Sequence, residues 1–275
     1  MTAIGRVNTL TIHRQTQAGF YANGGQLGDI FLSRRNAPEN CQIGDSIEVF
    51  IHHHSDGSLI GSHKTPLGQL GDVVMLKIAQ INDTGAFLDW GLDKELLLPY
   101  AEQMGELESG RKVLVKIYLD KSSRIVASMK LDEFIEDTAP QLKRGQCFEV
   151  TVANKTELGY KAVIDHQYWG LLYDSDLLRP LRKGEQLTAY VKKIRDDGRV
   201  DLSIQPISDG GNRDIGEKII EQLKANDGFL AMGDKSPPED IYALFGVSKK
   251  IFKQAIGRLY KQQRIAIEGG GIKLL

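Results

Sequence analysis

The sequence has 275 residues, of which 41% are hydrophobic and 26% are charged, and its formal net charge is −1. A chain of this length exceeds one small domain and fits three or four compact units. It contains no apolar run of the ~20 residues that cross a bilayer, no basic-then-apolar leader pattern, and only two cysteines, which give no disulfide framework. We therefore expect a multidomain protein of the reducing cytoplasm that makes no use of membranes. Any affinity for nucleic acid must come from local charge.

Most of the chain consists of one β-rich pattern that occurs three times. The copies begin at Gly5, Gly71 and Gly145, and apolar residues follow each glycine at the second, fifth and seventh positions. In every copy a second glycine comes 39 residues after the first and leads another strand-like alternation. Two strands with matched spacing, found three times, indicate an internal repeat.

The middle copy shows the pattern most clearly. Long alternating strands begin after Gly71 and Gly110, shorter strands are expected at 86–90 and 96–98, and a last strand ends at Ser128. The turns between them are short, so neighbouring strands should be antiparallel. Five such strands in about 60 residues predict a small closed or nearly closed barrel.

The repeat sets the expected domain boundaries. We assign three barrels to residues 1–66, 67–130 and 144–206, and an acidic, helix-prone linker to residues 131–143. A polar stretch at 208–211 is expected to connect the third barrel to a last domain.

Residues 212–275 have a different periodicity. Their apolar residues recur about every 3.6 positions, which predicts three helices, the second capped by Ser236 and the third by Ser248. A hairpin around residues 269–271 completes a winged helix-turn-helix. The fold class is therefore mainly β with a small α+β domain: three tandem oligonucleotide-binding (OB) barrels followed by a winged helix.

The third helix of this last domain is basic. Residues 248–264 include Lys249, Lys250 and Lys253 and contain no acidic residue, whereas charges elsewhere are mixed in sign. Such a run is explained equally well by a solvated helix face and by contact with nucleic-acid phosphates.

The sequence contains no recognisable catalytic or metal-binding motif. It has no phosphate-binding loop, no nucleophile motif and no cluster of carboxylates at metal-ligand spacing. His52, His53 and His54 lie on an expected strand, but no cysteine or carboxylate stands nearby at ligand spacing, which favours exposed or partly packed histidines. We expect no enzymatic activity, no cofactor and no metal.

Three stretches, at 170–175, 194–203 and 248–257, carry a resemblance to known proteins. The repeats resemble the S-one-type RNA-binding repeat of ribosomal protein S-one, which is an OB barrel. Over nearly its full length the chain resembles the conserved virulence factor B family (CvfB/YitL-like) of bacterial RNA-binding proteins, with three such barrels and a winged helix.

The resemblance implies a set of RNA-binding residues. In S-one-type repeats, RNA lies over exposed aromatics on the second and third strands, a histidine on the third strand, and an Asp/Arg pair at the closing hairpin. The matching residues are Phe20 and Phe31 in the first barrel, Phe87, Asp120 and Arg124 in the second, and Tyr160, Tyr173 and Arg199 in the third, with Lys249, Lys250 and Lys253 as phosphate contacts in the last domain.

The sequence departs from the family pattern at several of these places. Leu98 stands where the second barrel should have the histidine, and Tyr173 takes that place in the third. Arg199 has Asp196 nearby, whereas the first barrel has Ser58 in place of the arginine. We therefore expect the second and third barrels to contact RNA more than the first.

These features favour a non-enzymatic, monomeric protein that binds single-stranded RNA and regulates gene expression after transcription. Linked modules raise one another's effective concentration, so weak sites on several barrels give a useful overall affinity. Two alternatives remain open: a DNA-binding transcription regulator led by the winged helix, and an adaptor that binds the ribosome or another protein.

Overall fold

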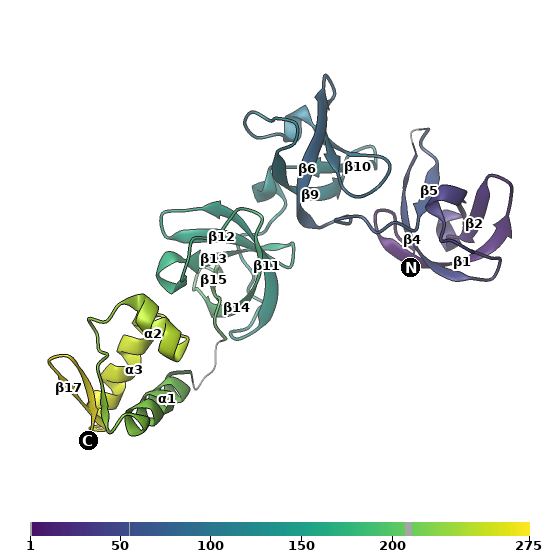
Figure 1. Cartoon of the computed structure of the whole chain (residues 1–275). Helices are drawn as coiled ribbons and strands as arrows, with labels where there is room; N and C mark the ends of the chain where they lie inside the picture. Colours follow the sequence, from purple (N-terminus) through teal and green to yellow (C-terminus); the bar gives the residue numbers. More distant parts are fainter. Residues whose placement is uncertain (1, 55, 207–210) are drawn as a thin grey trace. The chain divides into compact units, whose positions relative to one another are not determined.

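The computed structural model describes residues 2–54, 56–206 and 211–275 and contains three five-stranded β domains and a small domain of helices and strands (Figure 1). Of the linker expected at 208–211, residues 208–210 lie outside this description. The chain forms two compact units, residues 1–135 and residues 136–275.

The three β domains have the same strand order. The first consists of β1 (Val7–Gln15), β2 (Gly19–Asn23), β3 (Asp29–Ser33), β4 (Ser46–His53) and β5 (Leu59–Ser62). The second consists of β6 (Val73–Asn82), β7 (Gly85–Asp89), β8 (Leu96–Pro99), β9 (Lys112–Leu119) and β10 (Ile125–Ser128). The third consists of β11 (Cys147–Lys155), β12 (Gly159–Ile164), β13 (Tyr168–Tyr173), β14 (Gln186–Ile194) and β15 (Val200–Ser203).

The first and third domains are closed barrels, because β3 pairs in parallel with β5 and β13 with β15. The sheet of the second domain runs β10-β9-β6-β7-β8, and its two outer strands are not paired with each other. Alternate residues of every strand fill the interior; in the second barrel these include Leu76, Ile78, Leu88 and Leu98, all fully buried. The period of two seen in the sequence is therefore the inside–outside alternation of barrel strands.

A glycine begins the second strand of each barrel because another chain segment passes too close for a side chain. A Cβ atom on Gly19 would lie 2.0 Å from the carbonyl oxygen of Leu32, and one on Gly159 would lie 2.0 Å from that of Leu172. These glycines fix where the second strand starts, and the following residues take the same inside–outside order in each barrel.

The linker helix expected at 131–143 is reduced to one 3-10 turn, Leu131–Glu133. Beyond this turn the chain runs along the third barrel and pairs with it. The backbone carbonyl of Glu136 accepts a hydrogen bond from Trp169 at 2.8 Å, and its N–H donates one to Gln167 at 2.8 Å. Ala139 is fully buried in the core of that barrel. Pairing and burial thus hold an acidic segment extended although its composition favours a helix.

The last domain is a winged helix (Figure 1). Its elements are α1 (Gly211–Ala225), β16 (Phe229–Leu230), α2 (Pro238–Phe245), α3 (Lys249–Lys261), β17 (Ile265–Glu268) and β18 (Gly271–Leu274), and the strands form a sheet in the order β16-β18-β17. Ser248 stands at the N-cap position of α3, as predicted, but its side chain makes no capping hydrogen bond, and the N-cap of α2 is Pro237 and not Ser236. The hydroxyl of Ser236 instead accepts a hydrogen bond from the backbone N–H of Gly233, which shapes the preceding loop.

The first two barrels share a packed junction within the first unit. Phe50 faces outward from β4 and is 1% exposed, because its ring meets Trp90 of the second barrel edge-on at 5.4 Å between ring centroids. The backbone N–H of Leu70 donates to the carbonyl of Gly5 at 2.8 Å, and Lys64 forms an ion pair with Asp93 at 2.6 Å. Apolar burial, a backbone hydrogen bond and an ion pair together hold these two barrels against each other.

Candidate nucleic-acid interface

The strand register identifies equivalent outward positions in the three barrels. On the second strand, two residues after its first glycine, lie Tyr21, Phe87 and Lys161. Each is paired with an outward residue of the third strand, namely Phe31, Leu97 and Leu171. We call these six residues the platform positions, because they form the middle of the outer face of each barrel.

The closing hairpins are equivalent as well. His54, Asp120 and Arg195 each donate a backbone hydrogen bond, at 2.8–2.9 Å, to the carbonyl of the residue four positions later. Those acceptors are Ser58, Arg124 and Arg199. The Asp/Arg pair of the second barrel therefore corresponds to His54 and Ser58 in the first and to two arginines in the third.

Two of the predicted RNA-binding aromatics lie inside their barrels. Phe20 is 5% exposed in the core of the first barrel, and Tyr160 is 7% exposed in the core of the third. Both immediately follow the first glycine of the second strand, a position whose side chain points inward. Their assignment as stacking platforms was wrong, since a stacked base needs an open ring face.

Tyr21 is an outward-facing aromatic of the first barrel that the sequence prediction did not name. It is half-buried, its ring centroid lies 5.2 Å from that of Phe31, and the guanidinium of Arg14 stands 3.8 Å above it. Counting two residues from Gly19, as from Gly85 to Phe87, would have found Tyr21 in the sequence.

The register also separates two residues that the sequence placed together. Tyr173 is paired with Gly159 and thus corresponds to Pro99, which is paired with Gly85. Leu98 corresponds to Leu172, and both are fully buried core residues. The place of the family's histidine is therefore taken by Pro99 in the second barrel, and not by Leu98.

In the second barrel the predicted Asp/Arg pair is formed. The Nε atom of Arg124 donates to Asp120 Oδ2 at 2.8 Å, and the backbone N–H groups of Arg124 and Ser122 donate to Asp120 Oδ1. Burial raises the pKa of Asp120, but these hydrogen bonds outweigh it and hold the pKa below its usual value. Phe87 is half-buried and lines the same cavity as Arg124.

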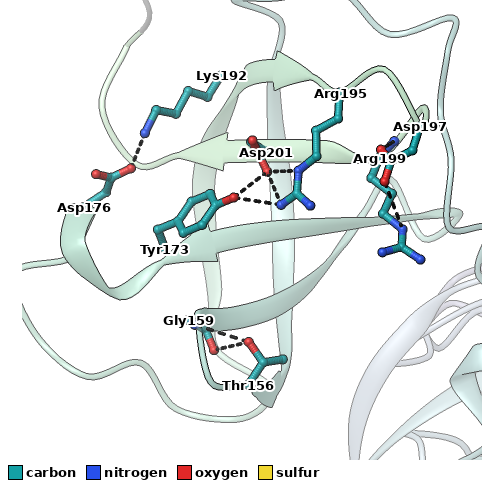
Figure 2. Close-up of polar contacts among 9 residues, drawn as sticks. All are labelled: Thr156, Gly159, Tyr173, Asp176, Lys192, Arg195, Asp197, Arg199 and Asp201. Carbon is teal, nitrogen blue, oxygen red and sulfur yellow. Dashed lines mark hydrogen bonds and ion pairs between the residues drawn. The ribbon is translucent and has the colours of Figure 1, made fainter.

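In the third barrel a different arginine carries the network (Figure 2). Arg195 donates from Nε and Nη2 to Asp201 Oδ1 at 2.8 and 2.6 Å, and from Nη2 to the hydroxyl of Tyr173 at 2.8 Å. Asp201 raises the pKa of Arg195 through these hydrogen bonds. Arg199, the predicted residue, is exposed and approaches Asp197 at 3.8 Å; its expected neighbour was Asp196.

The platform of the third barrel is cationic where the second has a phenyl ring. The Nζ atom of Lys161 lies 3.9 Å from the ring centroid of Trp169, which is 5% exposed beneath it. The Nζ atom of Lys192 lies 5.8 Å from the ring centroid of Tyr173 and pairs with Asp176. Lys161, Trp169, Arg195 and Arg199 line one cavity of about 560 Å³.

Comparison with known proteins identifies families in three parts of the chain. The S1 domain family, the S-one-type repeat, matches residues 4–64 and 70–130, and the family described as CvfB-like winged helix domain matches residues 217–274. The chain therefore carries S1 domains and a CvfB-like winged helix domain. This confirms the resemblance inferred from the sequence.

Relatives that match most of the chain are similar at 26% identity. "Conserved virulence factor B" of Staphylococcus saprophyticus aligns over 251 residues, covering 88% of this chain and 84% of that protein. An uncharacterized protein, YitL, of Bacillus subtilis aligns over 277 residues, covering 97% and 92%. A crystal structure described as a multidomain protein with nucleic acid binding domains from Streptococcus pneumoniae is 22% identical, with a TM-score of 0.39 and coverage of 99% of this chain and 98% of that one.

In the CvfB-like winged helix domain the predicted lysines lie on the first turns of α3. Lys250 and Lys253 are exposed and Lys249 is half-buried. Within the described parts of the chain, none of the three forms an ion pair, whereas Arg264 beyond the helix is paired with Glu217 at 2.8 Å. The three lysines, together with the partial positive charge of the helix amino terminus, suit a phosphate group.

Two further properties bear on the site. Among residues 2–54, 56–206 and 211–275, no group of three His, Cys, Asp or Glu side chains is placed to hold a metal ion. In the same described ranges, no helix combines the length and apolarity needed to cross a membrane. S1 and winged helix domains are nucleic-acid-binding folds, so the chain has the architecture of a nucleic-acid-binding protein.

Proposed function

We propose that this chain is a non-enzymatic, cytoplasmic protein that binds single-stranded RNA across its barrels and winged helix and thereby regulates gene expression after transcription. The observation that carries this proposal is a planar side chain beside a cation on the outer face of every barrel. Tyr21 lies under Arg14, Phe87 shares a cavity with Arg124, and Tyr173 accepts a hydrogen bond from Arg195.

This arrangement suits single strands better than duplexes. An unpaired base presents a free π face, and stacking on an aromatic ring contributes about 1–3 kcal/mol per base. The neighbouring cations attract the phosphates without regard to sequence. Paired bases in a duplex keep their faces stacked on one another and cannot use these rings.

Several weak sites in one chain support binding as a monomer. Once one barrel has bound a strand, the others meet that strand at high effective concentration, so no second copy of the protein is required. The lysines on α3 extend the set of phosphate contacts, and this role does not require the helix to read base edges.

The test compares binding of the full chain to fluorescently labelled single-stranded RNA and to duplex DNA of matching sequence at one salt concentration. We expect RNA to bind more tightly and its affinity to fall as salt rises. Tight, sequence-selective binding to the duplex alone would indicate a transcription regulator. Ribosome association without affinity for free RNA would indicate an adaptor.

A further inference from the structure

We propose that the first barrel completes the RNA site of the second, so that the two form one pocket that takes a single nucleotide of the strand. The histidine-rich end of β4 supplies one wall of this pocket and the platform of the second barrel supplies the other. The proposal rests on the RNA-binding function proposed above and adds where a base enters and which residues of the first barrel contact it.

The pocket is a cavity of about 620 Å³ at the junction of the two barrels. From the first barrel it is lined by His52, His53 and His54, and from the second by residues that include Phe87 and Arg124. Its volume lies within the range of about 300–1,000 Å³ that is usual for sites of small ligands. The first barrel therefore covers one side of the outer face of the second barrel and turns it into a pocket.

The junction that forms this wall is firmly packed. Phe50, two residues before His52 on β4, is buried against Trp90, and the ring of His52 stacks on Phe50 with 5.9 Å between centroids. Lys94 of the second barrel donates a hydrogen bond from Nζ to the backbone carbonyl of His53 at 3.4 Å. The histidines are thus held in place before any ligand binds, which lowers the entropic cost of binding.

The chemistry of the lining suits a nucleotide. Phe87, Trp90 and Leu97 give an apolar surface for a base. Lys94, Arg124 and His54 bring donors for a phosphate to the same cavity. The Nδ1 atom of His53 is buried and has no hydrogen-bond partner within the described residues, and a buried polar atom of this kind usually has one.

The gap between the unpaired outer strands β8 and β10 of the second barrel opens into the same cavity. Leu96 and Leu97 of β8, and Ile125 and Val126 of β10, line the cavity, and these two strands are not paired with each other. Strand edges present backbone N–H and C=O groups at the spacing of a β ladder, and such groups can pair with the polar edge of a base.

The occupant we infer is an internal nucleotide of a single strand, because Phe87 and Arg124 also belong to the outer face along which the strand would run. A free mononucleotide has the same chemistry, so the test must separate the two. The chain has two tryptophans, and Trp90 lies in the cavity lining whereas Trp169 lies in the third barrel. In the full chain carrying Trp169→Phe, tryptophan emission therefore reports on this pocket.

The experiment titrates this Trp90-only protein with a single-stranded RNA 10-mer and, separately, with AMP and UMP, while labelled-RNA anisotropy gives the affinity. We expect RNA to change Trp90 emission in step with binding, and mononucleotides to cause little change. His53→Ala and Lys94→Ala should each weaken RNA binding about tenfold, the size expected for one charge-assisted hydrogen bond. His63→Ala and Lys112→Ala, which alter exposed residues outside the cavity lining, should leave affinity unchanged.

The outcomes distinguish the two proposals. If RNA binds but Trp90 emission stays constant and both cavity variants bind like the parent, the composite pocket is wrong and RNA binding stands. If AMP or UMP produces the full response at similar affinity, the pocket takes a free nucleotide and the strand is not its ligand. If the parent binds no RNA and no mononucleotide, both proposals fail. Lys94 is exposed, so its variant tests the pocket even if His53→Ala does not fold.

Discussion

Arg195 and Tyr173 are joined on the third barrel by a hydrogen bond of 2.8 Å from the guanidinium to the phenolic oxygen. The same guanidinium neutralises Asp201, which is only 9% exposed. The main role of Arg195 is therefore structural, because it pairs with a buried carboxylate. It also orients the ring of Tyr173. Arg199, four residues later, is exposed and pairs only with the equally exposed Asp197 at 3.8 Å, so it is the more accessible cation of this hairpin for a phosphate.

The two arginines should accordingly respond differently to substitution. Arg195→Ala removes the cation that pairs with the buried Asp201 carboxylate and leaves it only the hydroxyl of Tyr173, so we expect a loss of about 1–3 kcal/mol in the unfolding free energy of this barrel. Arg199→Ala should change stability by less than about 0.5 kcal/mol. Urea unfolding followed by Trp169 fluorescence in a Trp90→Phe background measures both. Equal stability of the two variants would contradict this division of roles.

Substitutions of Phe87 and of its neighbour Leu88 test which side of β7 binds RNA. Phe87 faces outward and is half-buried, whereas Leu88 is fully buried in the core. Phe87→Ala should weaken single-stranded RNA binding by about 1–3 kcal/mol with little change in melting temperature. Leu88→Ala should instead cost about 2–5 kcal/mol of stability. Anisotropy and thermal unfolding of the same preparations decide the matter, and a large stability loss in Phe87→Ala would show its ring to be a core residue.

In the first barrel the same comparison involves Phe20 and Tyr21. Tyr21→Ala removes a half-buried ring that pairs with Phe31 and lies under Arg14, so RNA affinity should fall while the fold persists. Phe20→Ala empties a core position and should destabilise the barrel by about 3–5 kcal/mol. The measurements are RNA anisotropy and urea unfolding. Unchanged affinity in a folded Tyr21→Ala protein would mean that this face does not bind RNA.

The buried imidazole of His52 should make the protein less stable in mild acid. Burial lowers its pKa to about 4, with a further lowering from the charge of Lys94, although a backbone hydrogen bond at His53 opposes the shift. Between about pH 6.5 and pH 4 the unfolded chain therefore binds a proton that the folded chain does not. Stability present above pH 6.5 should decline as the pH falls through this window, by about 3 kcal/mol in total for this group.

Replacing His52 isolates this contribution. In His52→Gln the unfolding free energy should depend less steeply on pH between 6.5 and 4 than in the parent, whatever the effect of glutamine on stability at neutral pH. Urea unfolding at several pH values, followed by Trp90 fluorescence in the Trp169→Phe background, measures the two slopes. Identical slopes would mean that His52 gains its proton as readily in the folded chain as in the unfolded one.

The lysines of α3 should act through phosphates. The combined change Lys249→Ala, Lys250→Ala and Lys253→Ala should lower RNA affinity and flatten the dependence of log affinity on log salt, by about 0.7 for each phosphate that the protein no longer neutralises. Lys235→Ala, which alters a lysine in a loop of the same domain, is the matched control and should leave the slope intact. If the triple variant instead abolished only a sequence-selective affinity for duplex DNA, the winged helix would be a DNA reader.

The sequence by itself determined the repeat, the barrel strands and the winged helix. Strand residues that point alternately into and out of a barrel repeat with a period of two, and residues on one face of a helix repeat with a period of about 3.6. These elements can therefore be predicted from short segments of the sequence. The Asp120–Arg124 pair was predictable for the same reason, because both residues belong to one tight hairpin.

Only the tertiary structure decided which neighbours face outward and which barrels join. Phe20 and Tyr21 are adjacent aromatics, and a shift of one residue in register exchanges the core ring for the exposed one. Phe50 packs against Trp90, which belongs to another barrel and to a distant part of the sequence. Such contacts depend on packing between segments far apart in sequence, and no local period records them.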